Sequence, residues 1–111
     1  MKLKLSESQL SGLNRTFVDA YKDSIETAGN ETLDFADVIW KDDIAEIVEI
    51  CRKFGIKEFT VSVMMGNLIN ALEEFENRGF KIDGLTKVKA RYKNWRTGEQ
   101  DIVPAIKLKA K

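Results

Sequence analysis

The sequence predicts an α+β domain, with N-terminal helices followed by a strand–helix–strand–strand order. Apolar residues recur every three or four positions in the N-terminal half, which is typical of helices that bury one face. Beyond residue 58, short stretches alternate apolar and polar residues, as half-buried strands do. A turn-like segment, 96–99, separates the last two alternating stretches. We therefore expect a small three-stranded mixed sheet with helices on one face and a C-terminal β-hairpin.

The size and composition of the chain fit one globular domain that spans residues 1–111. The 111 residues are 43% hydrophobic and 32% charged, which is ordinary for a single folded core. No window approaches the roughly 18 uncharged apolar residues of a membrane span. We expect a cytoplasmic protein, because a single cysteine cannot form an internal disulfide.

The first predicted helix covers residues 6–28. Ser6 and Gln9 have the spacing of a capping box, in which two side chains satisfy free amides at a helix start. Gly29 and Asn30 both tolerate a positive φ and so mark its end. The apolar stripe of this helix consists of Leu10, Leu13, Phe17, Ala20 or Tyr21, Ile25 and Ala28.

A second helix is expected from Asp43, which forms an N-terminal box with Glu46, to just before Gly55. Residues 31–42 fit neither the helical nor the strand period, and we expect a short helix or an irregular packed segment there. Trp40 precedes the helix start and is expected to pack on the core as a staple or lid.

The C-terminal half predicts a strand at 59–63, a helix at 65–78, a strand from Phe80 and a strand at 102–109. The strand–helix–strand unit predicts a right-handed crossover between parallel strands. Pro104 has no amide hydrogen and favours an edge strand or a bulge, so we expect the strand of residues 85–95 to be central. The predicted buried face of the helix consists of Leu68, Ile69, Leu72 and Phe75.

Charge is divided between two parts of a chain that is neutral overall. Residues 1–77 carry 15 acidic and 8 basic side chains, a net charge of −7, and residues 78–111 carry 3 and 10, a net charge of +7. Strand alternation predicts that many of these basic side chains share one sheet face. This predicted basic face, with the hairpin tip, comprises Lys87, Lys89, Arg91, Lys93, Trp95, Arg96, Lys107 and Lys109.

Three interpretations of the basic face stay open. It can be a solvated surface that prevents edge pairing, since lysine on strands often has this use. It can bind an acidic protein surface, including a second copy of the chain, whose N-terminal part has the opposite charge. It can also bind the phosphate backbone of a nucleic acid, although Trp95 is the one aromatic residue that follows the basic alternation. We take the acidic protein as the leading hypothesis and nucleic acid as the alternative.

Enzymatic chemistry is not expected. The chain has no histidine, which is the commonest general base and metal ligand near neutral pH. Its one cysteine, Cys51, lies on an apolar helical stripe, as a buried structural thiol does. We therefore expect no catalytic residues, no cofactor and no metal site.

The amino-acid sequence resembles a family of short uncharacterised proteins from Gram-positive bacteria and their phages or mobile elements. The resemblance covers about residues 35–108. It implies a cytoplasmic setting and an accessory role, and it carries over no activity and no site residues. The segments that carry it are FGIKEFTVS at 54–62 with the helix that follows, GLTKV at 84–88, WRTGE at 95–99 and VPA at 103–105.

Overall fold

The computed structural model describes residues 3–37, 39–63, 66–93 and 96–111, with side chains for all of these except 91–93. It confirms the α+β class and the predicted order of the main elements. The elements are α1 (Glu7–Leu10), α2 (Arg15–Tyr21), η1 (Lys22–Thr27), β1 (Asp34–Phe35), α3 (Lys41–Lys53), β2 (Glu58–Val61), α4 (Leu68–Asn77), β3 (Phe80–Lys93) and β4 (Gln100–Ala110). Within these described ranges, no helix is long and apolar enough to span a membrane.

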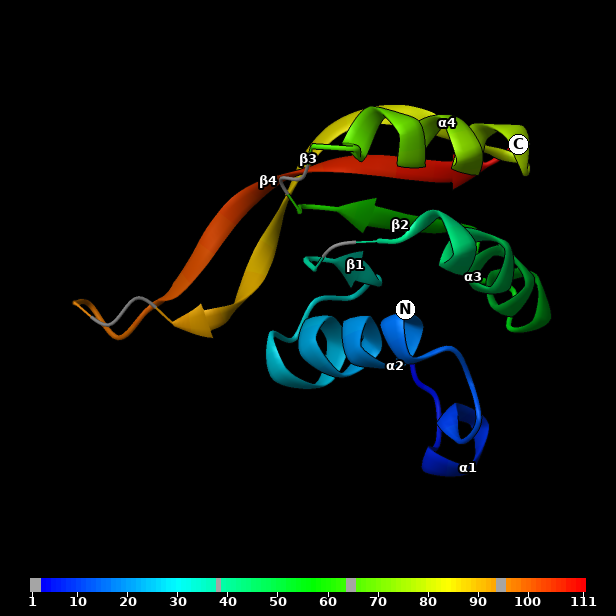
Figure 1. Cartoon of the computed structure of the whole chain (residues 1–111). Coiled ribbons are helices and arrows are strands. Elements are labelled where there is room, and N and C mark those ends of the chain that lie inside the picture. Colours follow the sequence, from blue (N-terminus) through cyan, green and yellow to red (C-terminus); the bar gives the residue numbers. More distant parts are fainter. Residues whose placement is uncertain (1–2, 38, 64–65, 94–95) are drawn as a thin grey trace.

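The sheet has four strands rather than three, in the order β1-β2-β4-β3 (Figure 1). β1 pairs with β2 in parallel, and β4 is antiparallel to both β2 and β3. β2 and β3 therefore run in the same direction, as the predicted crossover requires, but β4 lies between them.

Pro104 lies on the central strand β4, so the prediction that the strand of residues 85–95 is central was wrong. β4 pairs with β2 only from Ile106 to Lys109. Pro104, opposite Lys87 of β3, lies beyond the end of β2. The missing amide can therefore face an unpaired side of the strand.

The first predicted helix is interrupted. The capping box of Ser6 and Gln9 is present, but α1 ends at Leu10 and Gly12 adopts a φ of 78°. Asn14 then starts α2 by accepting a hydrogen bond from the amide of Phe17. The last part, η1, is a π-helix, and Gly29 ends it with a φ of 77°. The predicted helix of residues 6–28 did not take Gly12 into account, and this glycine allows the turn that divides the helix.

The segment 31–42 contributes the two-residue strand β1, and α3 begins earlier than predicted. Trp40 is the N-cap of α3 and is 65% exposed, so its predicted packing on the core was wrong. Asp43 does not cap the helix. Its carboxylate accepts hydrogen bonds from Asn14 (3.1 Å) and Thr16 (3.0 Å), and so links α3 to the start of α2.

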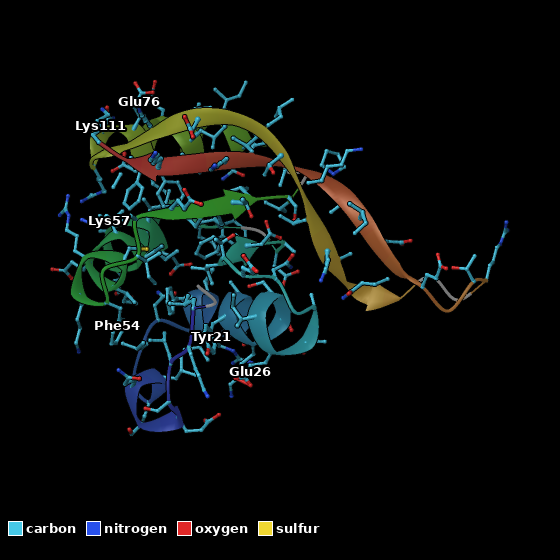
Figure 2. The ribbon with its side chains drawn as sticks, turned by 180° about the vertical axis from the view of Figure 1, so that it is seen from behind. Tyr21, Glu26, Phe54, Lys57, Glu76 and Lys111 are labelled. Atoms are coloured by element: carbon cyan, nitrogen blue, oxygen red, sulfur yellow. The ribbon has the colours of Figure 1, made fainter. Side chains whose placement is uncertain are left out.

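The core centres on Phe59 of β2. Its ring lies 5.4 Å from that of Phe35, 5.1 Å from that of Phe75 on α4 and 5.1 Å from that of Phe80 on β3. α3 packs beside α4, and α2 with η1 lies along the β1 edge of the sheet (Figure 1). Tyr21 of α2 is buried and accepts a hydrogen bond from the amide of Leu5 (2.8 Å), which fixes the N-terminal segment beneath the helix (Figure 2).

The helix α4 begins at Leu68, and Met65, at the start of the predicted helix, lies outside the described residues. Leu72 and Phe75 are buried as predicted. Ile69 is 80% exposed, so its predicted burial was wrong, and Ala71 is buried instead. An exposed isoleucine at the start of this helix is thus available to another molecule.

Candidate functional site

The last two strands extend well beyond the rest of the sheet. Residues 85–93 of β3 and 100–105 of β4 form a two-stranded ribbon past the end of β2, which we call the arm (Figure 1). The turn predicted at 96–99 is present, and Gly98 in it adopts a left-handed conformation with a φ of 72°. A ribbon of two strands has no neighbouring strand on either edge, so its backbone groups there must find other partners or solvent.

The register of the arm separates its two faces. Residues directly opposite each other on antiparallel strands share a face. Lys87 lies opposite Pro104, and Lys89 lies opposite Ile102. We define the outer face as these four residues with Leu85, and the inner face as Val88, Ala90, Val103 and Ala105.

The outer face is open and mixed in character. Leu85 is 80% exposed and Ile102 57%, and Lys87, Lys89 and Pro104 are also exposed. Neither lysine has an ion-pair partner among the described residues. The inner face is covered, with Val88 and Ala105 buried. The arm therefore presents aliphatic and cationic groups together on one side.

The predicted basic face is not continuous, because Lys107 and Lys109 lie on the other side of the sheet. Along β4 they alternate with Pro104 and Ile102, and they lie opposite Thr60 and Glu58 of β2. Lys107 Nζ is 3.9 Å from a carboxylate oxygen of Glu58 and 3.8 Å from one of Asp83. Local carboxylates thus already surround this lysine.

A β-bulge at Asp83 and Gly84 places Lys87 and Lys89 on a different face of the sheet from Lys107 and Lys109. Ile82 pairs with Leu108, but the next pair is Leu85 with Ile106, so β3 has one residue more than β4. Before the bulge, Lys81 and Lys109 face each other. The extra residue turns all later side chains of β3 to the opposite face. Gly84, with a φ of 93°, was the sequence signal for this bulge.

The remaining predicted residues lie at the far end of the arm. Arg96 is exposed in the turn. Trp95 and the side chains of Arg91 and Lys93 lie outside the described residues. The sequence reasoning missed Leu85 and Ile102, whose exposure depends on the bulge and on the reach of the arm beyond β2.

Asn30 anchors the arm to the body of the protein. Its side-chain amide donates to the carbonyl of Lys89 and accepts from the amide of Lys89, both at 2.9 Å. This pair of hydrogen bonds imitates a neighbouring strand at the free edge of β3. Within the arm, Gln100 donates a further hydrogen bond to the carbonyl of Ala90 at 2.9 Å. The arm is therefore held to the body at Lys89 while its outer face stays open.

A cavity of about 410 Å³ lies between the arm, η1 and the ends of β1 and β2. Asp34, on its wall, is buried and accepts hydrogen bonds from the hydroxyls of Thr60 (2.5 Å) and Ser62 (2.7 Å). Burial raises the pKa of Asp34, and the two hydroxyls oppose that rise. Further carboxylates line the cavity, but the described residues form no cluster of three or more side chains that could hold a metal ion.

Cys51 is fully buried on α3, which confirms its predicted structural position. Burial raises the pKa of its thiol to about 12, so the thiol stays protonated near neutral pH. This state suits a core side chain and not a nucleophile.

A family model for a domain of unknown function, DUF7698, matches residues 16–110. The chain belongs to this family. The match begins within α2 and includes the whole arm, whereas α1 lies outside it. No curated protein and no solved structure matches the chain. Membership agrees with the resemblance to an uncharacterised family and adds no activity, so the function has to be argued from the arm itself.

Proposed function

We propose that the protein is a non-enzymatic interaction module, and that the outer face of the arm binds an acidic protein surface. The observation that carries the proposal is the exposure of Leu85 and Ile102 beside Lys87 and Lys89. A purely solvated face would be expected to carry polar groups at these positions, because aliphatic side chains gain free energy when they leave water.

The kind of exposed apolar side chain favours a protein over a nucleic acid. Proteins that bind single strands stack bases on aromatic rings, whereas the described apolar residues of the outer face are aliphatic or proline. Aliphatic groups surrounded by cations suit a protein surface that carries apolar groups among carboxylates. Lys87 and Lys89 would then supply charge complementarity and orientation.

We also infer the cellular location and the source of the protein. We place it in the cytoplasm, as an accessory protein of Gram-positive bacteria or their mobile elements. The sequence resemblance supports the source, and a single cysteine, which cannot form an internal disulfide, suits a reducing compartment.

Selection from a displayed library of random peptides tests the proposal. The wild-type protein is the target, and the variant Leu85→Ser/Lys87→Ser serves for counter-selection. Lys81→Ser is the matched control, because Lys81 is exposed on the same strand but lies before the bulge on the other face. We expect peptides that combine Asp or Glu with aliphatic residues to be enriched on the wild type and on Lys81→Ser, but not on the double variant.

Two results would contradict the proposal. One is the absence of peptides that distinguish the wild type from Leu85→Ser/Lys87→Ser. The other is binding of labelled DNA or RNA, measured by fluorescence anisotropy at two salt concentrations, that weakens with salt and disappears in the same variant. The second result would assign the arm to nucleic acid.

A further inference from the structure

We infer that the acidic surface bound by the arm belongs to a second copy of this chain and lies at the N-terminal end of α4. The inference rests on the proposed function of the arm and names its partner. It follows from the positions of two exposed patches on one side of the sheet, and from their complementary charge.

The outer face of the arm and α4 lie on the same side of the sheet. Phe75 of α4 contacts Phe59, and Phe59 lies opposite Leu108 on β4. Along β4, Leu108 shares its face with Pro104 and Ile102 of the outer face, because these residues are separated by even numbers of positions. The register therefore places the helix and the outer face on one side of the molecule.

The N-terminal end of α4 points toward the arm. Glu76, near the C-terminal end of the helix, lies beside Lys111 at the end of the molecule remote from the arm (Figure 2). The ammonium of Lys111 donates a hydrogen bond to the carbonyl of Glu76 at 3.0 Å. The N-terminal end of α4 is thus the end nearest the base of the arm (Figure 1), and Ile69 lies in the first turn of this helix.

Ile69 and the exposed Glu73 are one helical turn apart on α4, so their side chains lie next to each other on its surface. Ile69 is 80% exposed. Glu74 is bound to Arg78 at 2.9 Å, whereas Glu73 has no ion-pair partner among the described residues. A shallow groove of about 250 Å³ lies between the start of α3 and one flank of α4, and it is lined by Lys41, Asn67, Asn70, Ala71, Glu73 and Glu74.

The two patches complement each other. The arm offers Leu85 and Ile102 with Lys87, and the surface of α4 offers the exposed Ile69 with Glu73. Because both patches lie on the same side of the molecule, a two-fold rotation lets each arm rest on α4 of the other copy, which gives a closed dimer. Direct contact of arm with arm would instead bring Lys87 and Lys89 against like charges.

Sedimentation equilibrium with charge-reversed variants tests the dimer. We expect the wild type to dimerise and to dissociate as salt is added. Lys87→Glu and Glu73→Lys should each raise the dissociation constant by about tenfold or more, since each change alters two equivalent contacts. The double variant Lys87→Glu/Glu73→Lys should return the constant to within about threefold of the wild type. The control Lys81→Glu should leave it unchanged.

A wild type that is monomeric up to about 1 mM would overturn the inference. A double variant whose dimer dissociation constant is no lower than those of the two single variants would also overturn it. These results are separable from the proposed function. A monomeric protein that still selects acidic aliphatic peptides through Lys87 would reject the second copy as partner and keep the arm as the binding surface. Failure of both experiments would reject both proposals.

Discussion

Asp34 is a buried carboxylate whose hydrogen bonds join three segments of the chain. Its side chain accepts from Thr60 and Ser62, in or just after β2, and its amide donates to the hydroxyl of Ser24 at 3.2 Å. Ser24 in turn donates to the carbonyl of Ala20 at 2.6 Å. These hydrogen bonds make the burial of a carboxylate tolerable, but its charged form is still penalised by lost hydration.

We expect Asp34→Asn to stabilise the protein near neutral pH, by about 1 kcal/mol. Burial raises the pKa of Asp34 above its ordinary 3.8, so the native state binds this proton more tightly than the unfolded state. The wild type therefore loses stability as pH rises from the pKa of Asp34 in the unfolded state to its higher pKa in the native state. The variant Asp34→Asn carries no titrating group at this position and does not lose stability there. Urea unfolding followed by circular dichroism at about pH 7 and about pH 4.5 should show the difference shrinking at the lower pH. A difference that is constant with pH would contradict this account.

Single residues were predictable where the signal is local. The capping box of Ser6 and Gln9 spans four residues, and the burial of Cys51 follows from one helical stripe. The roles of Asp34 and Asn30 were not predictable, because their hydrogen-bond partners lie 26 and 59 residues away. No sequence period encodes contacts of that range.

At the scale of elements, the alternating pattern predicted strands but not their register. β3 and β4 both occur where alternation indicated them. The bulge at Gly84 moved Lys87 and Lys89 away from Lys107 and so divided the predicted basic face. One added residue reverses every later side chain, so a face deduced across two strands depends on a feature that alternation does not show.

We expect Asn30→Ala to loosen the arm around Lys89. The change removes both hydrogen bonds to the backbone of Lys89 and should cost about 1–2 kcal/mol. Amide hydrogen exchange at Lys89 should become about tenfold faster or more. Gln100→Ala is the matched control, because it removes the bond to the carbonyl of Ala90 and leaves the amide of Lys89 paired. Equal exchange at Lys89 in the wild type and Asn30→Ala would contradict the anchoring role.

At the scale of the whole molecule, the sequence indicated the fold class, the division of charge and the hairpin. It did not indicate that β4 is central, or that β1 adds a fourth strand. β1 has two residues, too few to show a period, and the central place of β4 depends on contacts with β2 about 50 residues earlier in the chain. The result is a compact body with one projecting arm, whose two faces differ in exposure (Figure 1).

We propose that this molecule makes its contacts through the outer face of the arm. Lysine acetylation read by mass spectrometry can locate the contact, on the wild-type protein with and without a saturating peptide from the selection. We expect the peptide to slow acetylation of Lys87 and Lys89 and to leave Lys81 and Lys109, on the opposite face, unchanged. Protection of Lys81 and Lys109 in place of Lys87 and Lys89 would contradict the account.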